Sequence, residues 1–449
     1  MAAGRFAPGH LGELTRLVPF EMVDEALAQT KTVQSRIRDV PSRVVVYLLL
    51  AACLFPELGY PGVWRKLTAG LAGVRVAAPT PGALAQARRR VGVAPLRWLF
   101  DLLRAPAAVP HGRGTWWRGL LVCAIDGITM SVPDSAANLA WFTRHGGYHG
   151  GTGYPQARLL VLAACGTRTL IDAVFGPRAK GETTYAPGLL RSLRAGMIVL
   201  LDRNFAAAAL IAAIAATHAD VLVRVKNGRK LPCLRRCPDG SYLSVLGKTP
   251  VRVIDCQITI ATSGGRRTGT YRLATTLLDP GRYPAAELIR LYHERWEIET
   301  AYLELKSTIL GGRVLRARTP AGIDQEIYAL LVTYQLLRTA MADATACLPG
   351  RASFTIALHA ARDQLICAVG VIASTGHRPR RYHRPPRPGP PDARPAAAGQ
   401  PTHRQTRHLQ TPGPGPGRRP GQLQSHHQHR YPRPANDLDS QHQPLTTRP

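Results

Sequence analysis

The stretch from Tyr292 to Lys306 groups residues whose side chains could bind a phosphate or a metal ion. It reads YHERWEIETAYLELK, and Tyr292, Arg295, Glu299 and Lys306 follow one another at steps of three, four and seven residues. On a helix, at about 100° per residue, these four fall within roughly 60° of arc. The other acids of the stretch fall on another face. The spacing therefore predicts a functional face with one carboxylate among two cations and a phenol.

Two further acids stand at the ends of apolar runs that are typical of buried strands. Asp126 lies within GLLVCAIDGITMSV (119–132), and Asp202 ends the apolar run of GMIVLLDRNF (196–205). A buried carboxylate is costly unless it is paired or binds a metal ion. Each Asp alone also fits a structural role, because Asp126-Gly127 resembles the start of a turn and Asp202 suits the cap of a following helix.

Taken together, Asp126, Asp202 and Glu299 predict a metal site. Two carboxylates at strand ends and one on a helix can converge on a pair of divalent cations, and Mg²⁺ prefers such oxygen ligands. Two ions about 3.5–4 Å apart stabilise both the attacking and the leaving oxygen of a phosphoryl transfer. Asp134 competes with Asp126 as the first ligand, but Pro133-Asp134 is typical of a turn whereas an apolar strand precedes Asp126.

The charge of the chain indicates a polyanionic partner. Lys and Arg number 58 against 28 Asp and Glu, a formal net charge of +30. Nucleic acid is the first partner that this excess predicts, and an anionic membrane surface the second. The longest apolar run, residues 44–55, is too short to span a bilayer, and the N-terminus lacks the pattern of a signal peptide. A soluble, intracellular protein is expected.

The cysteines predict neither a metal site nor a disulfide framework. There are 8, and only Cys233 and Cys237 lie close together in the chain. No second pair and no nearby His completes a zinc site. Buried, reduced thiols are the expectation.

The chain divides into segments of different pattern, and these must position the acids. Residues 1–115 predict a helical region. Residues 116–218 predict the first part of an α/β core with a sheet covered on both faces, and 219–278 a small β insertion of short strands. Residues 279–345 return to helix and complete the core, and 346–376 predict a short helical segment.

One predicted helix of the first segment carries three consecutive arginines. TPGALAQARRRVG (80–92) has Thr80 as a plausible N-cap and Gly92 as a plausible stop. Arg88 and Arg89, with Arg90 beside them, either meet DNA phosphates or form a solvated basic face. The sequence favours neither alternative.

Residues 377–449 are rich in Pro, Arg and His and contain no Val, Ile, Phe, Met, Trp, Cys, Lys or Glu. Such a composition cannot bury a core and predicts disorder. The change is abrupt at ASTGHRPRR. Either this is a basic disordered arm, or it is the product of a reading-frame shift in a GC-rich gene, and the second alternative is favoured.

The spacing of Tyr292, Arg295, Glu299 and Lys306 resembles the Tyr-x2-Arg-x3-Glu-x6-Lys signature of insertion-sequence-4 family DDE transposases. DGITMSVPD (126–134) and LLDRNF (200–205) look like the first and second catalytic strands of that family, and residues 9–27 look like its N-terminal helical region. The resemblance covers about residues 10–345 and fades after about 376.

The resemblance implies a ribonuclease-H-like core with a β insertion before the last catalytic residue, preceded by a helical DNA-binding region. It assigns Asp126, Asp202 and Glu299 as the catalytic, metal-binding triad for two Mg²⁺ ions, with Mn²⁺ able to substitute. Tyr292, Arg295 and Lys306 would grip phosphates near the scissile bond. The implied activity is cut-and-paste DNA transposition by a bacterial cytoplasmic, nucleoid-associated homodimer acting on terminal inverted repeats and target DNA.

Other candidate DNA contacts keep their structural alternatives. Trp296 borders the functional face and would stack on a displaced base, although a core aromatic is favoured. Arg203 either touches DNA or pairs with an acid. Lys226, with Lys230 near it, lies at a predicted hairpin tip in VKNGRK, where a solvated turn is the default and DNA contact the alternative.

Two rival functions remain open on the sequence. One is a catalytically inactive DNA-binding copy of a transposase, and the other is a general nuclease with the same core. All three acids are present, which argues against decay of the site. The altered ending argues for damage elsewhere.

Overall fold

The structure is a computed structural model, and it describes residues 11–12, 14–36, 38–69, 76–107, 115–144, 153–262, 265–345 and 352–366. The side chains of 258–268 are not described. The predicted disordered tail, 377–449, lies outside the described residues. So do 346–351 and 367–376 of the predicted short helical segment, whose remaining residues contain helix α12 (Phe354–Ile366).

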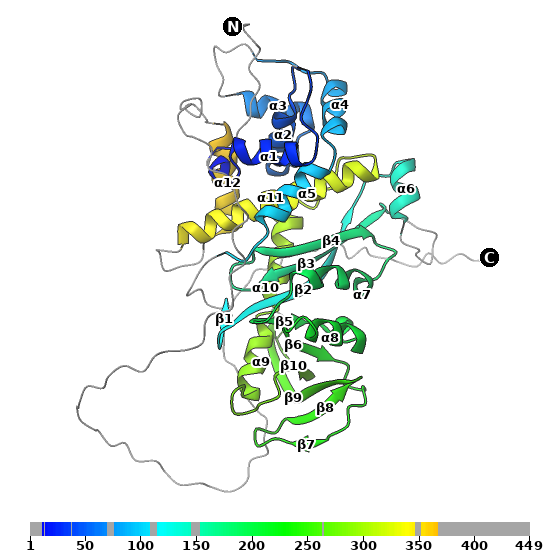
Figure 1. The fold of residues 1–449 in the computed structure, drawn as a ribbon, viewed down its shortest axis with the longest axis vertical. Helices are drawn as coiled ribbons and strands as arrows, with labels where there is room; N and C mark the ends of the chain where they lie inside the picture. Colours follow the sequence, from blue (N-terminus) through cyan, green and yellow to red (C-terminus); the bar gives the residue numbers. More distant parts are fainter. Residues whose placement is uncertain are drawn as a thin grey trace, which may run out of the picture.

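Five strands, beginning with the edge strand β4, form one side of a large mixed sheet (Figure 1). They are β2 (Leu120–Ser131), β3 (Gln156–Ala164), β4 (Leu170–Pro177), β5 (Met197–Leu201) and β6 (Asp220–Val225). Their spatial order is β4-β3-β2-β5-β6. The first three strands are antiparallel to their neighbours. β5 pairs parallel with β2, and β6 pairs parallel with β5. This arrangement is that of a ribonuclease-H-like core, so the predicted fold class is confirmed.

The strands of the predicted β insertion continue the same sheet. β10 (Gly265–Thr275) pairs antiparallel with β6, and β9 (Thr249–Thr262), β8 (Tyr242–Leu246) and β7 (Arg235–Arg236) follow outward. β6 itself, which begins at residue 220, belongs to the parallel centre. The predicted hairpin at VKNGRK is wrong, because β6 pairs with β5 and β10 and not with the strand that follows it. A turn remains there, closed by the Arg229 amide on the Lys226 carbonyl at 2.9 Å.

Alternate residues of β2 enter two cores, which confirms that the sheet is covered on both faces. Leu121, Cys123 and Ile125 join a cluster with helix α8 (Ala208–Ala215), α7 (Glu182–Tyr185) and the 3-10 turns η2 (Ala186–Ser192) and η3 (Arg203–Phe205). Val122 and Ala124 join the larger cluster on the other face. Because side chains alternate along a strand, Asp126 lies on that second face.

The second face is covered by the C-terminal helices and shared with the N-terminal region. Helix α11 (Pro320–Thr345) lies between the sheet and a group of helices drawn in blue in Figure 1. These are the short turn η1 (Leu14–Arg16), α1 (Phe20–Gln29), α2 (Ser42–Leu54), α3 (Tyr60–Thr68), α4 (Pro81–Val91) and α5 (Ala94–Leu103). The predicted helical N-terminal region is present. None of the described helices is long and apolar enough to cross a membrane.

The stretch from Tyr292 to Lys306 is not one continuous helix, and the expectation that it is regular is wrong. Helix α9 (Ala285–His293) ends before Arg295, and α10 (Trp296–Leu303) begins after a turn closed by the Arg295 amide on the Tyr292 carbonyl. Residues Glu304–Ile309, η4, form a π-helical turn. Gly311 and Gly312, with φ of 58° and 68°, end the segment because a left-handed backbone favours glycine.

Candidate active site

Sheet register brings Asp126 and Asp202 together. Ile125 of β2 is paired with Leu201 of β5 in a parallel ladder, so the next residues along the two strands, Asp126 and Asp202, are neighbours. Adjacent strands lie about 4.8 Å apart. Asp202 is the N-cap residue of η3, but its side chain makes no capping hydrogen bond, so the predicted cap is wrong. The carboxylate stays available at the end of β5.

Asp126 lies inside β2, so the alternative in which Asp126-Gly127 starts a turn is wrong. The amide of Gly127 donates to Asp126 Oδ1 at 2.8 Å. Burial raises the pKa of Asp126 to about 6, although the Gly127 bond and the Arg295 charge lower it. The structure therefore keeps a carboxyl in an environment that disfavours its charged form, as sites for cations often do.

Arg295 links the strand acid to the helix acid. Its Nη2 lies 2.9 Å from Glu299 Oε1, and its Nη1 lies 3.6 Å from Asp126 Oδ2. Arg295 is 8% exposed, and its buried Nε has no hydrogen-bond partner. The guanidinium is therefore the cation that neutralises Asp126 and Glu299 in this state.

Two tyrosines fix the helices against the strands that carry the acids. The Tyr292 hydroxyl of α9 donates to the carbonyl oxygen of Leu201 at 3.1 Å, directly before Asp202. The Tyr302 hydroxyl of α10 donates to the carbonyl oxygen of Asp126. Both rings are buried. The phosphate contact predicted for Tyr292 stays a prediction, and its hydroxyl contacts backbone in this structure.

Several predicted DNA contacts are exposed near the acids. Trp296 is 44% exposed, and the Arg295 guanidinium lies 5.3 Å from its ring centre, so the alternative of a core aromatic is wrong. Arg203, directly after Asp202, is exposed. Lys306 in η4 is exposed as well. The DNA contacts predicted for Trp296, Arg203 and Lys306 stay predictions.

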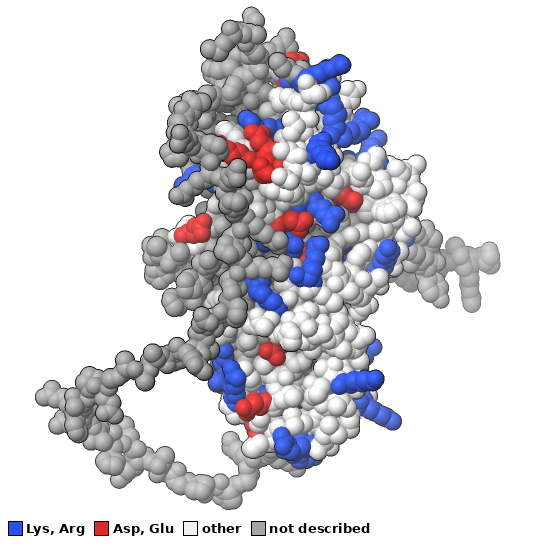
Figure 2. Space-filling model, in the orientation of Figure 1, with Lys and Arg blue, Asp and Glu red and all other residues white. Residues whose placement is uncertain are grey.

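The arginines of α4 separate into two groups. Arg88 points inward: its guanidinium lies 3.9 Å from the Tyr60 ring centre, and Nη2 lies 3.9 Å from Glu326 Oε1 on α11. Arg89 and Arg90 are exposed. Figure 2 shows Lys and Arg gathered at the upper right, where Figure 1 places α4. Lys226 and Lys230 are exposed at the turn that follows β6.

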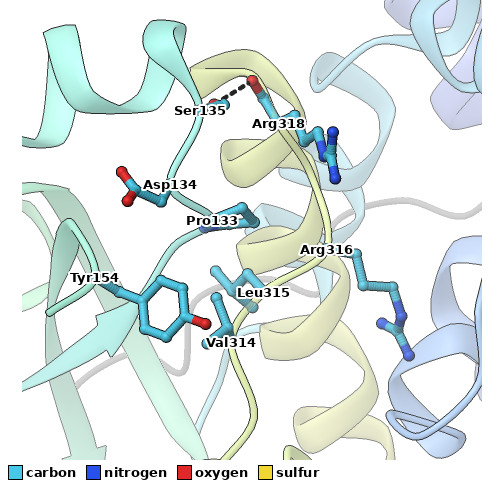
Figure 3. A pocket seen from close by; sticks show the side chains of 8 residues that line it. All are labelled: Pro133, Asp134, Ser135, Tyr154, Val314, Leu315, Arg316 and Arg318. Atoms are coloured by element: carbon cyan, nitrogen blue, oxygen red, sulfur yellow. Dashed lines mark hydrogen bonds between the residues drawn. The ribbon is translucent and has the colours of Figure 1, made fainter.

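Asp134, the rival to Asp126, belongs to a different place. It forms an ion pair with Arg144 and lines a separate open cavity of about 440 Å³. Figure 3 shows the Tyr154 ring facing Val314 and Leu315 there, and the Ser135 hydroxyl donating to the Arg318 carbonyl at 2.8 Å. Pro133 and Arg316 complete the lining. These partners favour Asp126 as the first acid of the site.

Two charged residues near the acids were missed by the sequence prediction. Val223 of β6 is paired with Leu201, so Arg224 is the neighbour of Asp202, and its guanidinium stacks 4.0 Å from the Tyr271 ring centre. A cation interrupting the apolar run VLVRV was the available signal. The other is Glu182 of α7.

Glu182 approaches β2 directly behind Asp126. A Cβ at Gly127 would lie 2.9 Å from Glu182 Oε1, so a larger residue at 127 would displace the Glu182 carboxylate. Glu182 also pairs with Arg158 Nη1 at 3.0 Å. Its position depends on how α7 packs, which no local pattern in the sequence indicates.

The donor chemistry at this site fits a hard divalent cation, since carboxylate oxygens from Asp126, Asp202 and Glu299 are such ligands. As the side chains stand, no group of three or more His, Cys, Asp or Glu among the described residues is close enough to hold an ion. The Arg295 guanidinium lies between two of the acids instead.

Acids at adjacent strand ends and on a facing helix form the kind of oxygen-donor set with which phosphoryl-transfer enzymes bind divalent cations. Two family models match the chain: the insertion element 4 transposase N-terminal region at residues 8–101, and the transposase DDE domain at residues 117–336. The chain belongs to the insertion element 4 family of DDE transposases. It is a DNA-cleaving enzyme that depends on a divalent metal ion.

Curated relatives agree with this assignment. The chain is 28% identical to the transposase InsG for insertion sequence element IS4 of Escherichia coli (strain K12) over 337 residues, which cover 72% of this chain and 74% of the relative. It is 28% identical to the putative transposase InsZ of the same strain over 192 residues, 42% of this chain and 62% of the relative. A piggyBac transposase synaptic complex with hairpin DNA matches with a TM-score of 0.44 and 10% identity, covering 79% of each chain.

Proposed function

We propose that this chain is a cut-and-paste transposase in which Asp126, Asp202 and Glu299 hold two Mg²⁺ ions, with Mn²⁺ able to substitute. The observation that carries the proposal is the register of β2 and β5, which makes Asp126 and Asp202 neighbours. Arg295 contacts Asp126 and Glu299 with the same guanidinium. Glu299 therefore lies near the ends of β2 and β5, where the two aspartates are.

In this proposal Arg295 changes partners when DNA arrives. Its guanidinium balances Asp126 and Glu299 in the free protein and then forms a fork on a phosphate oxygen pair, since Arg suits carboxylate and phosphate equally. Lys306 adds a point charge beside the phosphate, and the exposed Trp296 ring supplies a stacking surface for an unpaired base. When bound, the ions supply activation of a water and stabilisation of the leaving 3′ oxygen.

The DNA partners in this proposal are the terminal inverted repeats of the element and then target DNA. Arg89 and Arg90 on α4, Arg203 after β5 and Lys226 at the turn after β6 are exposed cations that suit phosphate contacts. Two element ends must be held together for cut-and-paste movement, so the active species is a homodimer on DNA in the bacterial cytoplasm.

Strand cleavage on defined DNA tests the function. Duplexes that carry the repeats flanking the gene are incubated with the protein and Mg²⁺ or Mn²⁺, beside duplexes with scrambled ends. A transposase cuts at the repeat ends and then joins the freed 3′ hydroxyl to the opposite strand or to target DNA. Equal cutting of scrambled DNA supports the nuclease instead, and repeat-specific binding without cutting supports the inactive copy.

A further inference from the structure

A single arginine in the β3–β4 hairpin holds the back of the helix that carries Glu299. Arg168 has a φ of 57°, in the left-handed region that side chains with a Cβ rarely adopt. Its amide donates to the Ala164 carbonyl at 2.8 Å, and its carbonyl accepts from the Tyr334 hydroxyl at 3.1 Å. A glycine would fit this backbone with less strain. The reason for an arginine must therefore lie in its side chain.

The Arg168 guanidinium bridges two acids of the signature stretch. Nε lies 2.6 Å from Glu297 Oε2 in α10, and Nη1 lies 2.8 Å from Glu304 Oε1 in η4. Both Arg168 and Glu297 are about four-fifths buried, at 18% side-chain exposure. These acids are seven residues apart, so the bridge spans the whole length of α10.

Helix α11 holds the other oxygen of Glu304. Arg338 Nε and the Tyr334 hydroxyl each lie 3.0 Å from Glu304 Oε2, and Glu304 is 5% exposed. Arg338 is packed against the Phe354 ring at 5.0 Å. Glu304 is therefore a fully bonded buried carboxylate, and its position is fixed from two sides.

The bridge lies where the helix changes its geometry. The π-helical turn begins at Glu304, and a π turn rotates every later side chain relative to a regular helix. Glu299 lies between the two bridged acids in the chain, and Lys306 follows two residues after the second. Fixing Glu297 and Glu304 from behind therefore sets where Glu299 and Lys306 point.

We propose that Arg168 is a positioning residue for the active site: by binding Glu297 and Glu304 together it sets the rotation of α10 and η4, and so the direction of Glu299 and Lys306. This inference rests on the proposed function for the role of Glu299. Its structural half, the fixing of α10, stands independently of that role.

Two readouts on the full chain test it. Amide hydrogen exchange of peptides from 296–309, measured by mass spectrometry, reports the order of α10 and η4 without any catalysis. Cleavage of repeat DNA reports the site. The variants are Arg168→Gly, which relieves the backbone and removes the guanidinium, and Arg168→Lys, which keeps a charge that reaches only one acid. His218→Gly is the control, since exposed His218 has a similar φ of 63°.

Arg168→Gly is expected to speed exchange in 296–309 and to lower the cleavage rate about tenfold or more, as loss of a residue that orients a ligand does. Arg168→Lys recovers part of both, and His218→Gly changes neither. Unchanged exchange in Arg168→Gly overturns the proposal, and so does faster exchange with undiminished cleavage. If the unaltered chain does not cleave, the proposed function fails, and the exchange data alone still decide whether Arg168 fixes α10.

Discussion

At the scale of single residues, the site holds one acid, Asp126, in an environment that disfavours its charged form. Asp126 is 22% exposed at its side chain, and burial is the largest cause of its raised pKa. The raised pKa, about 6 instead of 3.8, corresponds to about 3 kcal/mol for holding Asp126 ionised at neutral pH. Because ionised Asp126 lowers the stability of the fold, cation binding explains this residue better than a structural role does.

Replacing this acid is expected to stabilise the protein at high pH. With a pKa of about 6 folded and 3.8 unfolded, neutral Asp126 favours the fold below about pH 4, and this contribution is lost as pH rises towards 6. Asp126→Asn should therefore raise the free energy of unfolding by about 1–3 kcal/mol at pH 8 and by less at pH 4. Urea denaturation at both pH values measures it. Asp134→Asn, at an exposed ion pair, is the control and should change little.

The same pKa sets a lower pH limit for catalysis. A cation binds the ionised carboxylate, so protons compete with it as the pH falls below about 6. The rate of repeat cleavage at subsaturating Mg²⁺ should drop about tenfold per pH unit there, and added Mg²⁺ should restore part of it. A rate independent of pH between 5 and 7 would contradict this assignment of Asp126.

At the scale of elements, helix α4 shows how far a pattern predicts function. Thr80 accepts the Ala83 amide at 3.2 Å, and Gly92 has a φ of 67°, so both predicted ends of the helix are confirmed. The run of arginines did not indicate which of them faces inward. That depends on the contacts of Tyr60 and Glu326, which come from distant parts of the chain.

Adjacent arginines of α4 should give opposite phenotypes. Arg88→Gln removes a cation from a buried cluster and should lower the free energy of unfolding by about 1–3 kcal/mol. Arg89→Gln should leave stability unchanged and weaken DNA binding, with the slope of log Kd against log salt reduced by about 1. Urea denaturation and salt titrations of DNA affinity measure the two effects. Weaker DNA binding by Arg88→Gln at unchanged stability would contradict this division.

The signature stretch was predictable in its residue types and not in its geometry. Regular spacing groups Arg295 with Glu299, and the structure does join them. The break before α10 and the π turn depend on long-range contacts, those of Tyr292 with Leu201 and of Glu304 with Arg168. A helical wheel contains no information about such partners.

At the scale of the whole molecule, the N-terminal helices and the catalytic core share one hydrophobic cluster. Arg316, just before α11, donates to the carbonyls of Ala52 and Phe55 at the end of α2, at 2.9 and 2.8 Å. Glu326 of α11 accepts from the Tyr60 hydroxyl at 2.8 Å. The sequence pattern distinguishes the N-terminal helical region from the catalytic core. The packing of both regions against α11 could not be predicted from that pattern.

The shared core predicts that both regions unfold together. Thermal unfolding followed by far-UV and near-UV circular dichroism should show one coincident transition. Arg316→Gln should lower that single midpoint, because it leaves buried carbonyls of α2 unbonded. Two separated transitions would show that the N-terminal helices form an independent unit.

The proposed function depends on Glu299 binding a metal ion together with Asp126 and Asp202, and matched variants measure this dependence. Cleavage of repeat DNA in Mg²⁺ is measured for the unaltered chain, for Glu299→Gln and for Glu294→Gln, the same change five residues earlier in the turn before α10. Glu299→Gln is expected to lower the cleavage rate about 100-fold or more, and Glu294→Gln is expected to cleave at a near-normal rate. Equal cleavage by Glu299→Gln and the unaltered chain would contradict it.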